Sequence, residues 1–286
     1  MRKHRKLLNR ILLYLVVILI AVWTLAPYVW LIISSISLKV ELLRVPLRWL
    51  PSRPTLENYH DLFFGGGARF GGSASPIILA MKNSLVIALA STTICMVIGV
   101  FSAYALARLV FPGHRYYMLI LMACQMMPPI AIVVPGYIIL KRLNLLDSHL
   151  GLVLVYITFI LPLVVWIMRG YFASIPSELE DAARIDGCSR IGALFRVVLP
   201  LSGPGLVSTA VFCFIAAWNE FLYAFIYTNM NAKTMPVLIG EFCTKVGIEY
   251  LKMAAAGVVA SIPPVVLALI FQRFLIRGLT AGAIKG

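Results

Sequence analysis

The sequence predicts an all-α, polytopic membrane protein, on three observations: its composition, six long uncharged segments and the placement of its basic residues. The 286 residues are 61% hydrophobic and 13% charged. The six segments without Asp, Glu, Lys or Arg lie at about 11–36, 83–107, 117–140, 150–168, 199–219 and 254–272. Each is long enough for a helix to cross a hydrocarbon core of about 30 Å. We therefore expect six transmembrane helices in a single domain, residues 1–286.

The first apolar segment is expected to remain in the protein as a helix. It follows the basic run Arg2-Lys3-His4-Arg5-Lys6, which resembles the start of a signal peptide. However, the apolar stretch is longer than that of a signal peptide, and no small-x-small cleavage pattern follows it.

Basic residues set the expected orientation. Of the 25 Lys and Arg residues, 14 lie in segments 1–10, 108–116, 169–198 and 273–286, which are on average shorter than the segments 34–82, 141–149 and 225–253 that hold the other 11. Because short cytoplasmic segments are enriched in Lys and Arg, we expect both termini to be cytoplasmic. The net charge of +14 then needs no nucleic-acid partner to explain it.

The longest external loop is expected at about 37–82. Its stretch from Gly65 to Ser73 has the composition of a flexible linker. A phosphate-binding loop is the alternative, but no G-x-x-x-x-G-K-[ST] pattern occurs in the chain. We therefore expect a linker, and we expect no ATP site in this chain.

Residues 176–200 form a polar interruption that must face water. Ser177 and Glu180 have the spacing of a capping box, and acidic residues crowd the first turn of the expected helix. Gly187 suits the left-handed end of that helix, and Ser189 suits the cap of a second helix from Arg190 to Val198, ended by Pro200. The small residues Ala182, Ala183 and Gly187 would let another surface approach closely. A helix lying at the lipid headgroups is the alternative.

Other polar residues border the apolar segments. Gln125 and Met126 precede Pro128-Pro129, which should break the helix and either shape a translocation path or form a packing kink. Asn219 and Glu220 could line the path or make a helix-end or inter-subunit hydrogen bond. Tyr223 could stack on a sugar or belong to an interfacial aromatic belt. No His has a second ligand at metal spacing, so neither a metal nor a catalytic residue is expected.

The run Leu179-Glu180-Asp181-Ala182-Ala183-Arg184-Ile185-Asp186-Gly187, continued by Val198-Leu199-Pro200-Leu201, resembles the EAA loop of ABC importer permeases. Similarities to the carbohydrate-uptake branch, the maltose-permease-like subunits, extend over nearly the whole chain. They include Asn58-Tyr59, Asn83-Ser84-Leu85, Trp218-Asn219-Glu220-Phe221 and the terminal run from Gly278 to Gly286. One departure is that the glutamate of the EAA triplet falls at Asp181.

This resemblance implies a type I importer permease fold and a non-catalytic subunit of a bacterial inner membrane. A cytoplasmic coupling loop, about 169–198, would receive ATPase subunits. The implied coupling residues are Glu180, Asp181, Ala182, Ala183, Asp186, Gly187, Leu199 and Pro200, with a further contact at Thr280, Gly282 and Lys285. The implied partners are a second permease subunit, two ATP-binding subunits that hold ATP and Mg, an extracytoplasmic sugar-binding protein and membrane lipid.

The resulting expectation is the import of a di- or oligosaccharide, driven by ATP hydrolysis in trans. A permease of the same superfamily for glycerol phosphate or a polyamine is the first alternative. A membrane protein without a transport role would need polar catalytic groups within the membrane, and the apolar segments contain no charged residue to serve as one. A channel that needs no motor would conduct without ATP.

Overall fold

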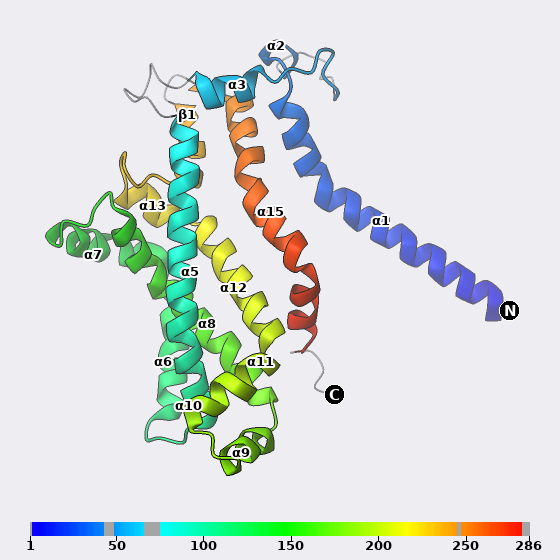
Figure 1. The fold of residues 1–286 in the computed structure, drawn as a ribbon. Coiled ribbons are helices and arrows are strands. Elements are labelled where there is room, and N and C mark those ends of the chain that lie inside the picture. The colour runs from blue at the N-terminus through cyan, green and yellow to red at the C-terminus, as the bar shows by residue number, and fades with distance from the viewer. Residues whose placement is uncertain (1, 43–48, 66–74, 245–246, 282–286) are drawn as a thin grey trace. The chain divides into compact units, whose positions relative to one another are not determined.

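The computed structural model describes residues 2–42, 49–65, 75–244 and 247–281. Contacts divide the chain into two compact units, Met1–Ile78 with Leu238–Ser261, and Leu79–Val237 with Ile262–Gly286. The expected single domain stays a prediction. The first unit contains α1 (Arg2–Ser35), α2 (Lys39–Leu42), α3 (Glu57–Phe64), β1 (Cys243–Thr244), β2 (Gly247–Ile248) and the start of α15 (Tyr250–Ala281) (Figure 1). The second unit contains most of α5 (Pro76–Arg108) and the rest of α15. Between them in sequence it contains α6 (His114–Met126), α7 (Pro129–Arg142), α8 (His149–Ser174), α9 (Ser177–Ile185), α10 (Arg190–Ala193), the π-helical turn η1 (Leu194–Val198), α11 (Leu199–Leu201), α12 (Gly203–Trp218) and α13 (Leu222–Tyr227). Helix α14 (Met235–Glu241) begins in the second unit and ends in the first.

The core of the second unit lies among α5, α8 and α12. Their buried faces carry apolar side chains at helical spacing, including Tyr156, Ile160 and Phe172 of α8, all fully buried. Gly205 of α12 lies against the ring of Tyr171, and a Cβ there would come within 2.6 Å of the ring. A larger residue would therefore force α12 away from α8, as expected where small residues allow membrane helices to pack closely.

Among the residues that the structure describes, four helices are long and apolar enough to cross a membrane singly: α1, α5, α8 and α15. The other two predicted spans are broken. The segment at 117–140 bends by 93° between α6 and α7, and α12 is bent by 80° from the helical segment before it. The first break lies at Pro128, and Pro129 begins a new helix there. The Pro128-Pro129 pair predicted this break, because proline cannot donate the hydrogen bond that would continue a helix. The second lies at Ser202, so the helix from Arg190 runs to Leu201, and the prediction that Pro200 ends it was wrong.

Hydrogen bonds connect the elements of the first unit. The Asn58 amide of α3 donates to the carbonyls of Ser35 and Ser37 at 2.9 and 3.1 Å, and the Tyr59 hydroxyl lies 2.7 Å from the Ser35 hydroxyl. Along the membrane segment, the Tyr28 hydroxyl lies 2.7 Å from that of Ser261 on α15. β1 and β2 pair as a short antiparallel ladder. Most of the glycine-rich linker, residues 66–74, lies outside the described residues.

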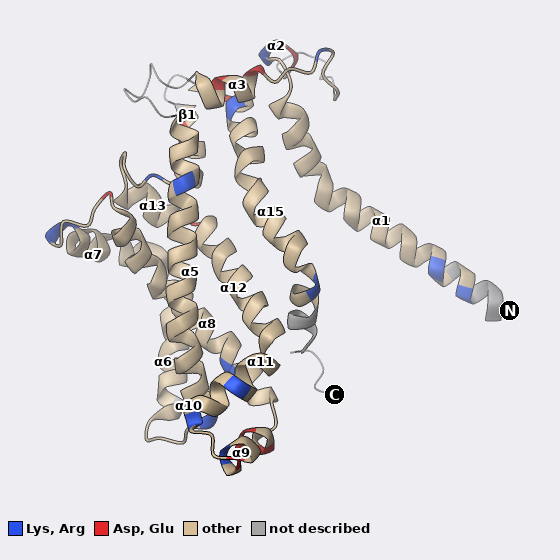
Figure 2. Ribbon diagram, viewed as in Figure 1, with Lys and Arg blue, Asp and Glu red and all other residues tan. Residues whose placement is uncertain are grey.

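Charged residues of the second unit gather at two places along the ribbon (Figure 2). One group lies around α9 and α10, and the other around the connection between α7 and α8. The long helices between them carry few charges, as the cost of placing a charge at a helix centre in a membrane predicts.

Candidate functional site

Helix α9 is short, polar and ended by Gly187. Gly187 has a φ of +89°, and the amides of Gly187 and Cys188 donate to the carbonyls of Arg184 and Ala183 at 3.1 and 3.0 Å. This is the Schellman arrangement, in which a left-handed residue lets the chain turn back over the last helical carbonyls. The expected left-handed end is thus confirmed. A Cβ at Gly187 would meet no atom of this chain within 4 Å, so only the backbone angle disfavours other residues there.

The start of α9 differs from the prediction. Pro176 occupies the cap position, where no side chain makes a capping hydrogen bond, and Ser177 is already the first helical residue. The expected capping box between Ser177 and Glu180 is therefore wrong. The Glu180 carboxylate points instead toward α5, where it forms an ion pair and accepts a hydrogen bond.

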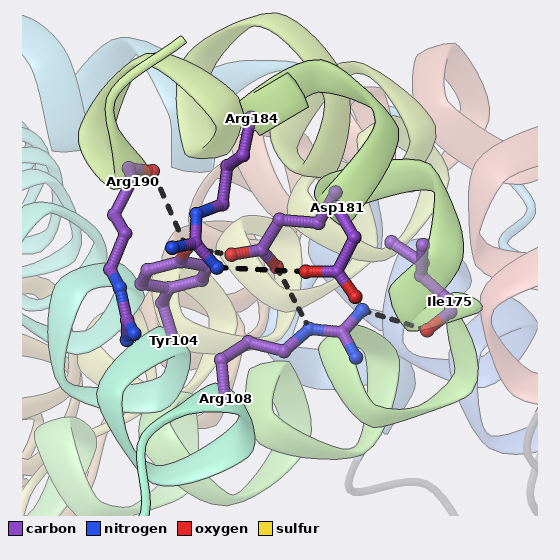
Figure 3. Close-up of polar contacts among 7 residues, drawn as sticks. Tyr104, Arg108, Ile175, Asp181, Arg184 and Arg190 are labelled. Carbon is purple, nitrogen blue, oxygen red and sulfur yellow. Dashed lines mark hydrogen bonds and ion pairs between the residues drawn. The ribbon is translucent and has the colours of Figure 1, made fainter. Parts of the chain in front are cut away.

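Two residues of α5, Tyr104 and Arg108, hold the Glu180 side chain, and both are labelled in Figure 3. Its Oε2 lies 3.3 Å from Nε of Arg108, and its Oε1 accepts a hydrogen bond from the Tyr104 hydroxyl. The Arg108 and Glu180 side chains are only 12% and 10% exposed. We call Tyr104, Arg108 and Glu180 the α9 anchor. Removing one member of a buried ion pair typically costs about 3–5 kcal/mol, since the other charge stays desolvated.

The α9 anchor also holds the chain on both sides of α9. Arg108 donates from Nη2 to the carbonyl of Ile175, just before the helix, at 2.7 Å. The Tyr104 hydroxyl lies 3.3 Å from the carbonyl of Arg190, just after it. The last turn of α5 is itself tied to its neighbours, because His114 Nε2 and Arg169 Nε lie 3.0 and 3.4 Å from the carbonyl of Leu106. The anchor therefore rests on a fixed end of α5.

The rest of α9 faces away from the protein. Among its nine residues, all of which the structure describes, Glu180 alone is buried and Ala183 is half-buried. Asp181 and Arg184 form an exposed ion pair at 3.6 Å. The side chains of Leu179 and Ile185 are 46% and 87% exposed, although both are apolar. The exposed residues thus combine apolar, small and charged side chains, as protein interfaces do. Ala182, Asp186 and Gly187, named from the sequence, belong to this exposed surface.

The segment after α9 confirms one expected cap. Ser189 Oγ accepts from the amide of Gly192 at 3.1 Å and begins α10. The helix then widens into η1, where the amide of Leu199 donates to the carbonyl of Leu194, five residues earlier. A π-turn just before Pro200 accommodates a residue that has no amide hydrogen to donate. Leu199 is half-buried and Pro200 is exposed.

Two of the five predicted pathway residues contact Phe159 of α8, and a third, Glu220, binds the backbone of one of these two. Gln125 Nε2 donates to the Phe159 carbonyl at 2.7 Å, and the Tyr223 ring stacks on the Phe159 ring at 5.9 Å. The Glu220 carboxylate accepts from the amides of Tyr223 and Ala224 at 2.8 and 3.1 Å and so caps α13. Tyr223 is only 4% exposed, which leaves little of its ring for a ligand. The helix-end role weighed for Glu220 is present in the structure, and a pathway role for these residues stays a prediction.

The remaining predicted residues lie apart from the residues around α9 and from those around Phe159. Met126 ends α6 with 84% of its surface exposed, and Asn219 is exposed at the end of α12. Thr280 belongs to α15, which runs to Ala281, whereas Gly282 and Lys285 lie outside the described residues. Within the described parts of the chain, no three His, Cys, Asp or Glu side chains come together as a metal site would require.

A second polar group, which the sequence did not indicate, surrounds Asp147. Its carboxylate accepts from the backbone amides of residues 229–232 at 3.0–3.2 Å, and from the Asn231 side chain at 3.0 Å. Asp147 has a φ of +54° and donates its own amide to the carbonyl of Tyr227 at 2.9 Å. Burial raises the pKa of this carboxyl, but the four backbone N–H donors outweigh that effect and the net pKa is lowered.

The same group extends to the start of α5. The Asn83 amide donates to the carbonyls of Asn231 and Lys233, both at 2.9 Å, and its Oδ1 lies 2.8 Å from Nε2 of His149. Ser84 Oγ accepts from the amide of Met235 at 2.8 Å. We call Asn83, Ser84, Asp147 and His149, with the loop at 228–235, the Asp147 clamp. Asn144 and Asp147 both have a positive φ, a backbone conformation that Asn and Asp adopt more readily than most residues. The presence of these two residue types in a short loop is the one feature of the sequence that indicates this turn.

Comparison with known proteins places this arrangement in a family. Residues 95–281, which include α9 and both its neighbours, match the family described as "Binding-protein-dependent transport system inner membrane component". The chain belongs to this family. It is also 38% identical to the sulfoquinovosyl glycerol transport system permease protein SmoH of Agrobacterium fabrum, over 91% of this chain and 88% of that protein. It is 38% identical to the trehalose/maltose transport system permease protein MalG of Thermococcus litoralis, over 99% of both chains.

The fold agrees with that family. A chain of a bacterial ABC transporter involved in the import of the acidic polysaccharide alginate matches with a TM-score of 0.72 over 93% of this chain and 96% of that one, at 21% identity. The all-α importer permease fold expected from the sequence is therefore confirmed. The chain is an inner-membrane transport component, as its resemblance to carbohydrate-uptake permeases implied.

Proposed function

We propose that this chain is the membrane-spanning subunit of an ATP-driven importer that carries a di- or oligosaccharide across a bacterial inner membrane. Membership of the transport family and relatives named for sugar glycosides and disaccharides support this proposal. One observation carries its mechanism: α9 presents an almost fully exposed surface while a buried ion pair holds it to α5.

ATP and Mg would bind to two partner subunits docked on α9, with both termini on the same, cytoplasmic side. The exposed Asp181, Ala182 and Ile185 provide a surface of mixed chemistry for that contact. Thr280, Gly282 and Lys285 would supply a second contact. A second permease subunit would complete the path, and a binding protein would deliver the sugar from the outside. Closure of the ATPase pair would then rock the membrane helices between inward-open and outward-open states.

Substitution of Gly187 tests the docking. Gly187→Asp should abolish ATP-dependent uptake while the chain still inserts, because the added side chain projects from α9 into space that this chain leaves open. Gly187→Ala is the matched control, since it introduces the left-handed strain of about 1 kcal/mol with little added bulk. Uptake is measured in proteoliposomes with the intact complex and labelled trehalose or maltose, and with glycerol phosphate or a polyamine for comparison. Normal transport and normal ATPase stoichiometry in Gly187→Asp would contradict docking at this site, and uptake of glycerol phosphate or a polyamine instead of sugar would contradict the substrate class.

A further inference from the structure

The side-chain attachment of α9 to α5 depends on one carboxylate, that of Glu180. Within α9, which is described in full, Glu180 is the only buried residue, so apolar packing contributes little to holding the helix. The other ion pair on α9, Asp181–Arg184, joins two residues of the same helix and is 63% and 43% exposed. Such a pair can stiffen α9 but cannot connect it to another element. A force applied to α9 therefore reaches α5 through the Glu180 side chain and through the flanking residues Ile175 and Arg190, which the same anchor holds.

The partners of Glu180 lie one turn apart at the end of a single long helix. Tyr104 and Arg108 are four residues apart on α5, so their side chains project from the same face. α5 has 33 residues, about 50 Å at the rise of an α-helix, enough to cross a membrane. A displacement of Glu180 is thus applied directly to the end of a membrane helix.

The geometry fixes the orientation of α9 as well as its position. Arg108 contacts Glu180 and, at 2.7 Å, the carbonyl of Ile175, so one guanidinium holds both the first turns of α9 and the residue that precedes the helix (Figure 3). Two attachment points resist rotation, whereas one would act as a pivot. The low exposure of the pair keeps competing water away and strengthens the attraction between the charges.

We propose that Glu180 and Arg108 are positioning residues that convert movement of α9 into movement of α5 during transport. This inference rests on the proposed function, because it takes the docked ATPase as the source of the movement. It separates two roles within one short helix: the exposed residues bind the partner, and the α9 anchor transmits its motion. Loss of the anchor should then uncouple ATP hydrolysis from transport without preventing assembly.

The test compares Glu180→Gln with the wild-type chain in its intact complex, purified through a tag and reconstituted with its binding protein. Glu180→Gln retains the shape of the side chain but removes its charge. We expect the ATPase subunits to co-purify at wild-type stoichiometry and ATP hydrolysis to change by no more than about twofold. Sugar transported per ATP hydrolysed should fall about tenfold or more, the ratio that corresponds to about 1.4 kcal/mol of lost coupling.

Three further variants sharpen this test. Glu249→Gln removes the carboxylate of another short ion pair, 3.0 Å from Lys252, outside α9 and α5, and should leave the ratio unchanged. Arg108→Lys retains the charge but lacks the two-pronged geometry, and should retain more coupling than Arg108→Gln. The reciprocal swap, Glu180→Arg with Arg108→Glu, should restore part of the ratio. If Glu180→Gln does not yield a monodisperse complex, the Arg108→Lys and Arg108→Gln pair decides the question by itself.

Two results would overturn the inference. An unchanged ratio of sugar to ATP in Glu180→Gln and Arg108→Gln would mean that the anchor transmits nothing. Loss of the ATPase subunits from these variants would place Glu180 in the docking surface instead. Failure of the proposed function would look different, because the wild-type complex itself would then show no ATP-dependent uptake.

Discussion

A carboxylate contributes to the contacts at each end of α5, buried at one end and half-buried at the other, and the two carboxylates meet different partners. At the end near α9, Glu180 pairs with the side chains of Arg108 and Tyr104. At the other end, Asp147 accepts hydrogen bonds from the backbone amides of residues 229–232, and Asn83 and Ser84 bind the same loop. Twenty-five residues separate Asn83 from Arg108, or about 37 Å along the helix.

The two ends of α5 differ in how their contacts respond to the loss of one side chain. The α9 anchor depends on two or three side chains that water does not reach, so losing one leaves a desolvated charge. The Asp147 clamp consists of many parallel contacts, and those between the Asp147 carboxylate and residues 229–231 are exposed, so water can replace a lost acceptor there. A helix end with few, strong contacts suits transmission of a movement, and one with many replaceable contacts suits a static support.

The largest expected effect is at the α9 anchor. Arg108→Ala should release α9, because Glu180 would otherwise stay buried without its cation, at a cost of about 3 kcal/mol or more. Hydrogen exchange of the α9 amides should then accelerate by about 100-fold or more, while exchange in the loop at 229–232 stays unchanged. Equal acceleration in both regions would indicate global destabilisation and would break the comparison between the two ends.

A smaller effect is expected at the Asp147 clamp. Asp147→Ala removes the acceptor of four backbone amides, of which those of residues 229–231 are exposed, and it should cost about 1–2 kcal/mol, or roughly 5–30-fold faster exchange in the loop at 229–232. The matched control is Asp147→Asn, which retains one carbonyl acceptor and should show an intermediate rate. Faster exchange in α9 than in this loop would contradict the assignment of separate supports.

The smallest effect concerns pH. Because the folded-state pKa of Asp147 lies below its ordinary value near 4, its contribution is fully present above about pH 4 and is lost as the pH falls through the lowered value. Intrinsic-rate-corrected exchange of the 229–232 amides should therefore stay constant from pH 7 to 5 and rise only in stronger acid. Asp147→Asn should lack this acid dependence, and a midpoint above pH 5 in the wild-type chain would argue against the lowered pKa.

The fold was largely predictable because its dominant signal is local. Apolar segments without charge mark membrane helices, and Pro128-Pro129 marked the break between α6 and α7. The break at Ser202 was missed, although Ser202-Gly203-Pro204-Gly205 is a run of residues that commonly interrupts a helix. Gly187 and Ser189 were correctly placed at helix ends, because capping depends on neighbouring residues.

The contacts of the site depend on distant residues, and these could not be read from one sequence. Glu180 has the spacing of a capping residue, but its partners Tyr104 and Arg108 lie more than 70 residues earlier. From the sequence, Arg108 is only one of many basic residues that predict the orientation, and no role is predicted for Asp147. In each case the tertiary partner outweighs the local preference of the side chain.

The inward face of α9 has a consequence for how this helix can vary. Since Glu180 is the only buried residue of α9, most other positions of this helix can change without removing its contact with α5. A saturation library over Ser177–Ile185 would therefore read out partner choice nearly free of misfolding, with position 180 as its exception. By the same reasoning, we expect substitutions in α9 to allow a different ATPase subunit to bind while the membrane helices behind it stay unchanged.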